Sequence, residues 1–294
     1  MRQSRKSGLL IASIAAAIVA LVVLAGILGL GWWPHGSSSP GNLQPLPHLS
    51  ITLAARSAAE VDFLLTTARP LIEPGDSFDL VVGNGSLSQE TANQDAQQLR
   101  SEFSGVTVFA HTSGLENYSE VTEGVGTNVS GVLYDYEPGY EPEFTFNFTQ
   151  TLANLEEATA IAHRQGVASV GYVTGRPILE SSLEKYGWNY AVMALSVDRL
   201  IAQTQTYCAQ SRSAFLNATS KVIGQFQAAN MTSVPTFQIT IGNATTQLPN
   251  GVTAVPAYDC ASELVSIGLH TLYIWWDQGG ESDLLAFLQD IGRS

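Results

Sequence analysis

The sequence has very little cysteine: Cys208 and Cys260 are the only two in 294 residues. No His-x-His, His-Glu-x-x-His or Cys-x-x-Cys pattern occurs, which disfavours a metal hydrolase, so we expect no metal. A phosphate-binding glycine loop and a nucleophile elbow are also missing, and we expect no cofactor. In an oxidising compartment the two cysteines, Cys208 and Cys260, are expected to form a disulfide, with two inert buried thiols as the alternative.

Basic residues are scarce as well. The chain has 13 Lys and Arg against 26 Asp and Glu, a formal net charge of −13. Three of the basic residues, Arg2, Arg5 and Lys6, precede the first long apolar run, so the remainder carries 10 against 26, a formal charge of −16. A domain this acidic repels phosphate backbones and anionic headgroups, and we expect no nucleic-acid partner.

The one long apolar run covers residues 8–31 and contains no charge. It is long enough to span about 30 Å of hydrocarbon, and Trp32 and Trp33 suit the outer interface. The basic residues before it place the N-terminus in the cytoplasm. Residues 1–33 are therefore predicted to be a single-pass anchor in the cell membrane, or an uncleaved signal, with an extracytoplasmic C-terminal domain. A cleaved signal peptide is the alternative.

Residues 34–48 are rich in proline, serine and glycine, a composition typical of an exposed linker. Residues 49–294 then fit one barrel-sized domain. This domain contains more Asn-x-Ser/Thr sequons than chance predicts, which favours a glycosylated exterior, although a chain rich in serine and threonine also forms sequons by accident. The sequons begin at Asn84, Asn117, Asn128, Asn147, Asn217, Asn230 and Asn243.

Strand-like and helix-like segments alternate through the domain. The predicted strands are residues 48–56, 77–84, 106–111, 129–137, 167–174, 190–197, 234–241 and 271–277. The predicted helices are residues 58–68, 89–103, 149–165, 198–228, 257–267 and 282–291, and the connection after the third strand reads as short and poorly helical. Eight such units predict an α/β fold, a TIM-like (β/α)8 barrel, with a doubly wound open sheet as the alternative.

In the fourth predicted strand the stretch Gly131-Val-Leu-Tyr-Asp-Tyr-Glu-Pro138 is apolar until it ends in Asp135 and Glu137. Residues two apart on a strand share a face, so both acids would point into the mouth of the barrel, where active sites of this fold lie. Partial burial and a neighbouring charge would make Glu137 a proton donor near neutral pH. The alternative is that the pair only caps the strand and binds the following loop.

The same strand parity places other polar and aromatic side chains at this end, as a sugar or another polar ligand needs. On the eighth strand Tyr273, Trp275 and Asp277 face inward, and Trp275 offers a floor for a pyranose ring. The remaining candidates for substrate binding are Arg56, His111, Tyr172, Arg176 and Gln238. His111 is expected to be a satisfied rim histidine rather than a base. Asp277, Glu141 and Glu143 are further candidates for a second carboxylate.

Residues 130–137, Ser-Gly-Val-Leu-Tyr-Asp-Tyr-Glu, resemble the fourth-strand signature of the chitinase-like family-18 glycoside hydrolases, Asp-Gly-x-Asp-x-Asp-x-Glu. Gly131, Asp135 and Glu137 match it, whereas Ser130 and Leu133 replace two of its acids. The resemblance implies that Glu137 is the general acid and that Asp135 orients the substrate's acetamido group, the internal nucleophile of that retaining mechanism. It also implies that Trp275 lines the sugar site.

The family's sixth-strand tyrosine has no clear counterpart, because Met193, Leu195 and Ser196 occupy that neighbourhood. Two hypotheses follow. The first is a membrane-anchored, extracytoplasmic glycoside-hydrolase-like barrel acting on a polysaccharide or glycan. The second is a catalytically inactive barrel that binds carbohydrate or has a structural role at the cell surface, which Leu133 and the sequons after several strands favour.

Overall fold

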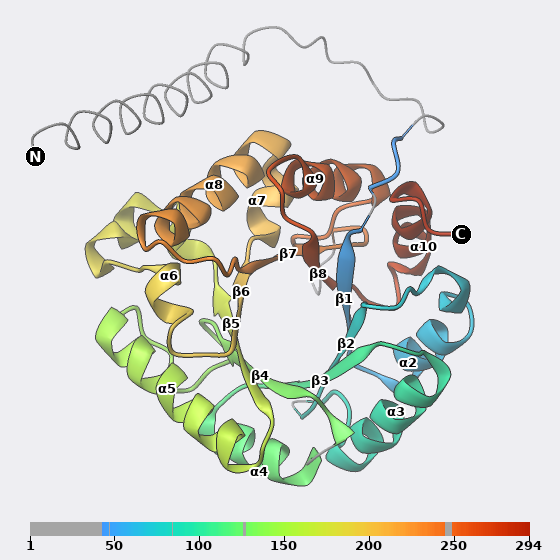
Figure 1. Cartoon of the computed structure of the whole chain (residues 1–294), viewed down its shortest axis with the longest axis horizontal. Coiled ribbons are helices and arrows are strands. Elements are labelled where there is room, and N and C mark those ends of the chain that lie inside the picture. The colour runs from blue at the N-terminus through green and yellow to red at the C-terminus, as the bar shows by residue number, and fades with distance from the viewer. Residues whose placement is uncertain (1–42, 47, 84, 126–127, 245–248) are drawn as a thin grey trace, which may run out of the picture. The chain divides into compact units, whose positions relative to one another are not determined.

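The computed structural model describes residues 43–46, 48–83, 85–125, 128–244 and 249–294, and residues 44–294 form one compact unit. Within it, eight parallel strands pair in chain order, and the last pairs with the first to close a barrel (Figure 1). The strands are β1 Ser50–Ala55, β2 Ser77–Val81, β3 Thr107–Thr112, β4 Gly131–Tyr136, β5 Ala168–Thr174, β6 Arg199–Gln203, β7 Thr236–Thr240 and β8 Thr271–Trp275.

Helices alternate with these strands and form the outer ring (Figure 1), which confirms the predicted TIM-like barrel. The α-helices are α2 Ala58–Leu65, α3 Gln89–Glu102, α4 Leu115–Val125, α5 Phe148–Arg164, α6 Tyr190–Met193, α7 Gln205–Gln210, α8 Arg212–Ala228, α9 Ala254–Ser266 and α10 Glu281–Asp290. Short 3-10 helices in the described part of the chain are η2 Arg69–Leu71, η4 Arg176–Ile178 and η5 Ser181–Tyr186.

Polar caps begin several of the helices shortly after a strand. The Ser57 hydroxyl accepts from the Glu60 amide at 3.2 Å before α2, and Ser88 accepts from the Thr91 amide at 3.1 Å before α3. Asn147 caps α5 in the same way, with its side chain 3.2 Å from the Gln150 amide. Each cap satisfies an amide that the first helical turn leaves free, so it fixes where the chain turns from strand to helix.

Apolar and aromatic side chains form a packed cluster inside the barrel. The cluster consists of Ala54, Phe109, Leu133, Val170, Tyr172, Ile201 and Tyr273, with Trp275 packed against it. The inward parity predicted for Leu133 and Tyr273 is therefore confirmed. The barrel interior is a packed core, and this core supports the polar groups at the C-terminal ends of the strands.

The opposite end of the barrel is closed by a buried ion pair. The Arg293 guanidinium binds the Asp76 carboxylate, with Nη2 2.9 Å from Oδ1, and donates to the Leu49 carbonyl at 2.8 Å. The Ile51 amide also donates to Asp76, at 3.1 Å. Because Asp76 precedes β2 and Leu49 precedes β1, this pair ties the end of the chain to the N-terminal ends of two strands.

Two sequence predictions were wrong in this part of the fold. Residues 190–197 do not form the sixth strand: Tyr190–Met193 is helix α6, and β6 is Arg199–Gln203, inside the segment predicted as helix 198–228. The Asn189 side chain caps α6 by accepting from two amides at 3.0 and 3.2 Å, which fixes helical geometry in this apolar run. The connection after β3 also contains a helix, Leu115–Val125.

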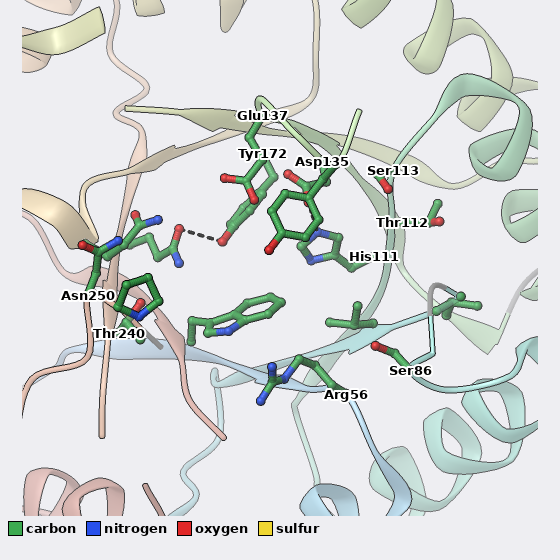
Figure 2. A pocket seen from close by; sticks show the side chains of 18 residues that line it. Arg56, Ser86, His111, Thr112, Ser113, Asp135, Glu137, Tyr172, Thr240 and Asn250 are labelled. Carbon is green, nitrogen blue, oxygen red and sulfur yellow. Dashed lines mark hydrogen bonds and ion pairs between the residues drawn. The ribbon is translucent and has the colours of Figure 1, made fainter. Parts of the chain in front are cut away.

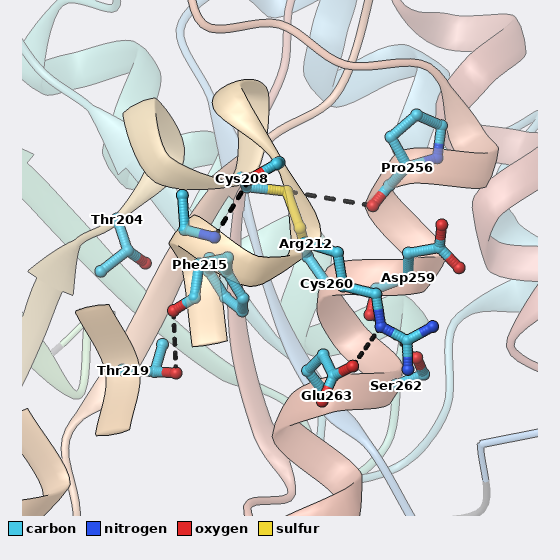
Figure 3. The surroundings of a disulfide bond; sticks show 12 residues. Thr204, Cys208, Arg212, Phe215, Thr219, Pro256, Asp259, Cys260, Ser262 and Glu263 are labelled. Atoms are coloured by element: carbon cyan, nitrogen blue, oxygen red, sulfur yellow. Dashed lines mark hydrogen bonds and ion pairs between the residues drawn. A yellow bond between two sulfur atoms is a disulfide. The ribbon is translucent and has the colours of Figure 1, made fainter. Parts of the chain in front are cut away.

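Cys208 and Cys260 form the predicted disulfide, which joins α7 to α9 with the two Cα atoms 6.1 Å apart (Figure 3). The compact unit begins at Gln44, whose carbonyl accepts from the Tyr258 hydroxyl at 2.6 Å. Among the described residues no helix is both long and apolar enough to cross a bilayer. The anchor predicted at residues 8–31 and the sequon at Asn84 lie outside the described residues.

Candidate active site

A cavity of about 390 Å³ opens at the C-terminal ends of the strands. Figure 2 shows the side chains of Asp135, Glu137, His111 and Tyr172 directed toward one space from neighbouring strands. The lining includes seven residues predicted from the sequence: Arg56, His111, Asp135, Glu137, Tyr172, Gln238 and Trp275. It also includes Ser86, Thr112, Ser113, Tyr140, Gln205, Thr240 and Asn250, which the sequence analysis did not single out.

Strand β4 brings the two acids to this cavity. Asp135 lies within the strand opposite Tyr172 of β5, and Glu137 is the first residue after it. The intervening Tyr136 faces the other way, where its ring packs 5.1 Å from that of Phe144 and its hydroxyl accepts from the Thr145 amide. The alternation of the strand therefore separates two acids on the cavity side from aromatic residues on the helix side.

Burial changes the protonation of both acids. It raises the pKa of Glu137, and the negative charge of Asp135 raises it further, to about 8. Burial also raises the pKa of Asp135, although a hydrogen bond from His111 and the charge of that residue oppose the rise. Glu137 is therefore protonated at neutral pH, the state that a general acid needs.

Below the acids lies a buried network that joins three strands. His111 Nδ1 is 2.7 Å from Asp79 Oδ2, and His111 Nε2 is 3.5 Å from Asp135 Oδ2. The Tyr273 hydroxyl donates to the same Asp79 oxygen at 2.5 Å. His111 is hydrogen-bonded and lines the cavity, as predicted, but it lies deeper than an exposed rim position, with 2% of its surface exposed.

Amide side chains continue this polar layer around the barrel. Gln203 Nε2 of β6 donates to Asp135 Oδ1 at 3.4 Å, and the Tyr172 hydroxyl donates to Gln238 Oε1 at 2.6 Å (Figure 2). Gln203 is the residue of the sixth strand that lies at the site, whereas Met193, Leu195 and Ser196 do not belong to that strand. Because the sixth strand was predicted at residues 190–197, Gln203 was not among the predicted site residues.

An aromatic and cationic wall forms another side of the cavity. The Arg56 guanidinium lies 5.3 Å from the centre of the Trp275 ring and forms ion pairs with Glu60 at 3.4 Å and Asp277 at 3.9 Å. Asp277 does not line the cavity. Tyr140 lies in the loop after β4 and is 63% exposed, so it presents a free ring face at the mouth.

A second cavity, of about 370 Å³, adjoins the first and shares Glu137, Gln205 and Asn250 with it. Arg176 lines this second cavity rather than the first, and its Nε donates to Glu180 at 3.2 Å. The buried side-chain oxygen of Gln205 has no hydrogen-bond partner among the described residues. An oligomeric ligand can therefore extend on both sides of Glu137.

The two other candidate carboxylates, Glu141 and Glu143, lie outside both cavities. Glu141 is buried and accepts from the Gly114 amide at 2.8 Å and from the Glu143 amide at 3.1 Å. Through these two hydrogen bonds Glu141 holds the loop after β4 against the loop after β3. No cluster of three or more metal-ligating side chains occurs among residues whose structure is described.

The sequence matches no protein-family model and no curated protein. The fold is similar to that of a class V chitinase from Pseudomonas fluorescens Pf-5, with a TM-score of 0.56, 9% identity and coverage of 83% of this chain and 99% of that one. It is also similar to the PgaB (BpsB) glycoside hydrolase domain from Bordetella bronchiseptica, with a TM-score of 0.55, 10% identity and coverage of 78% and 94%.

The catalytic domain of a family GH18 chitinase from the fern Peteris ryukyuensis gives a TM-score of 0.54 at 10% identity, covering 82% of this chain and 98% of that one. The resemblance to chitinase-like family-18 glycoside hydrolases predicted from residues 130–137 is thus confirmed for the fold. This chain shares its barrel fold with these glycoside hydrolase domains.

Proposed function

We propose that the protein is a glycoside hydrolase that cleaves a polysaccharide or glycan bearing acetamido sugars. The observation that carries this proposal is the pair of acids at the end of β4, placed in a cavity where burial and Asp135 raise the pKa of Glu137 to about 8. Further support comes from the similar fold of the chitinase catalytic domains.

In the proposed reaction Glu137 donates its proton to the glycosidic oxygen as the bond from that oxygen to C1 breaks. The carbonyl oxygen of the substrate's acetamido group forms a new bond to C1, while Asp135 accepts a hydrogen bond from the acetamido N–H. Water then attacks C1 and gives a proton to the Glu137 carboxylate, which restores the acid and the acetamido group. The anomeric configuration is retained.

The remaining cavity residues would bind the sugars. Trp275 provides a flat apolar face for the ring at the cleaved bond, and the Arg56 guanidinium beside it also lines the cavity. The exposed ring of Tyr140 offers a second stacking surface at the mouth. Because the second cavity continues past Glu137, the leaving part of the substrate can be an oligosaccharide.

The test is the variant Glu137→Gln, which keeps the shape of the side chain but removes its transferable proton. We expect hydrolysis of acetamido-sugar oligomers to fall by about 100-fold or more. Glu141→Gln is the matched control, because burial raises the pKa of Glu141 to about 8 as well, yet this residue lines neither cavity. Equal hydrolysis by wild type and Glu137→Gln would refute the proposal.

A carbohydrate-binding barrel without activity is the second candidate. Three sequons, at Asn117, Asn147 and Asn243, follow β3, β4 and β7, so their exposed side chains lie toward the end where the cavity opens. Glycans on all three would hinder entry of a polymer. Mass spectrometry of the purified protein tests this: full occupancy together with binding but no cleavage would favour the inactive barrel.

For the location we propose that residues 8–31 anchor the barrel on the extracytoplasmic side of the cell membrane. The uncharged run, the preceding basic residues and the sequons support this arrangement. Protease treatment of intact cells tests it: the barrel should be released, while an N-terminal tag should stay protected. Protection of the barrel would contradict it.

A further inference from the structure

The buried network of Asp79, His111 and Tyr273 has no role in the chemistry proposed above. Asp79 is completely buried, and its Oδ1 has no hydrogen-bond partner among the described residues. Charged groups inside a protein cost several kcal/mol each unless well paired, and apolar residues of similar size would fill a barrel interior at lower cost. His111, the partner of Asp79, lies with its Nε2 3.5 Å from Asp135 of the site, so this buried polar network is a candidate for a functional role.

The surroundings of His111 favour the doubly protonated imidazolium. Asp79 of β2 faces Nδ1 and Asp135 of β4 faces Nε2, while β5 and β8 contribute the rings of Tyr172 at 4.8 Å and Trp275 at 5.9 Å. Burial alone would lower the pKa of His111, but the two carboxylates raise it to about 10. Glu137 lies on the same side and carries a negative charge only when it is ionised.

An imidazolium beside Asp135 makes the two acids of β4 differ in how readily they ionise. It favours the ionised form of Asp135, whose other oxygen accepts from Gln203. An ionised Asp135 in turn disfavours ionisation of Glu137. Adjacent acids take separate roles when their surroundings differ in this way. On β4 itself the preceding inward residue is the apolar Leu133, which offers Asp135 no polar contact.

We propose that Asp79 and His111 are positioning residues that hold Asp135 ionised and oriented, so that the proton of the pair stays on Glu137. This inference rests on the proposed function of Glu137. Tyr273 supports the arrangement by donating to the Asp79 oxygen that also binds His111. The three residues come from β2, β3 and β8, so the network reaches the acid pair from outside strand β4.

The test is the pH dependence of kcat in Asp79→Asn and His111→Gln. Without the imidazolium, Asp135 takes up a proton more readily, so the acid limb of the profile should move up by about one pH unit or more. We expect kcat at neutral pH to fall about 10- to 100-fold while KM changes less than about threefold. Loss of stability alone would lower the amount of active enzyme without moving the limb.

A second histidine and aspartate pair provides the control. His163 Nε2 lies 2.8 Å from Asp198 Oδ2 on the exposed outside of the barrel, remote from both cavities. His163→Gln and Asp198→Asn should leave the acid limb unchanged. An acid limb in Asp79→Asn that matches the wild type would overturn the inference while leaving Glu137 as the acid.

Nitrogen NMR of the histidines gives a readout that does not need activity. The chain has five histidines, so the His111 resonances can be assigned by comparison with His111→Gln. In wild type and in Glu137→Gln both ring nitrogens should remain protonated from pH 6 to about 9. In Asp79→Asn one proton should be lost at a lower pH. A neutral His111 at pH 7 in the wild type would overturn the inference.

Failure of the proposed function has a different signature. An inactive wild type, with Glu137→Gln equally inactive, would remove the reaction and this inference with it. An active wild type whose Asp79 and His111 variants keep its kcat and its pH profile removes the inference alone.

Discussion

Glu137→Gln should make the folded protein more stable at neutral and alkaline pH. The pKa of Glu137 is raised from 4.5 to about 8 in the folded state, first by burial and then by the charge of Asp135. A raised pKa means that the folded protein holds this proton more tightly than the unfolded chain does. The wild type therefore loses stability as the pH rises from about 4.5 to about 8, and an uncharged glutamine removes this loss.

The size of the effect follows from the shift. Each pKa unit corresponds to about 1.4 kcal/mol. The free energy of unfolding of Glu137→Gln should therefore exceed that of the wild type by about 5 kcal/mol above pH 8 and by about 3 kcal/mol at pH 7. For a domain of this size, 3 kcal/mol corresponds to an increase in Tm of roughly 6–12 °C. Near pH 4 the two proteins should be equally stable, because Glu137 is then protonated in both the folded and the unfolded state.

Thermal unfolding at pH 4, 7 and 9 checks this prediction, with Glu123→Gln as a control on the exposed face of α4. The gain in Tm should grow between pH 4 and pH 8 and then level off. A gain that is absent at pH 9, or that is the same at every pH, would refute the reasoning, because the destabilisation would then not come from ionisation of Glu137.

Three further predictions concern the ends of the barrel and the disulfide. Arg293→Met leaves the charge of Asp76 buried without its partner, so unfolding in guanidinium should show a loss of about 3–5 kcal/mol; a loss below 1 kcal/mol would contradict the role given to this pair. Tyr140→Ala removes an exposed stacking face at the cavity mouth, so initial rates should show KM raised about tenfold with kcat nearly unchanged, and an unchanged KM would count against sugar binding there. Replacing Cys208 and Cys260 together by serine opens a loop with a sequence separation of 52, which should cost about 4 kcal/mol of stability in the same denaturation experiment; equal midpoints for this variant and the wild type would contradict this.

The acid pair could be predicted from the sequence because all the necessary information lies in one strand. The run from Gly131 to Tyr134 carries no charge, the length of the segment fits a strand, and the alternation that places Leu133 in the core also places Asp135 on the same side. No knowledge of neighbouring strands was needed. The same holds for Trp275, the last residue of β8, whose side follows from its alternation with the apolar Leu272 and Ile274.

The network around His111 could not be predicted in this way, because it depends on register. In the parallel pair β2 and β3, Asp79 lies opposite Phe109 and Val81 lies opposite His111. Asp79 and His111 therefore share an inward face and meet diagonally across the two strands. Since they are 32 residues apart in the sequence, only the register shows that these two buried polar groups are partners.

The position of the sixth strand was predicted wrongly, and a pattern shared by its neighbours shows the correct position. On four neighbouring strands an inward apolar residue is followed two positions later by an inward residue with a polar group. This step from apolar to polar marks where the core of the barrel ends and the site begins. The four pairs are Phe109 and His111, Leu133 and Asp135, Val170 and Tyr172, and Ile201 and Gln203. In the predicted strand 190–197, Met193 is followed by Leu195, so the step is missing. The segment Arg199–Gln203 shows the same change of character as its neighbours β3, β4 and β5, and by that comparison the sequence itself favours β6 at this position.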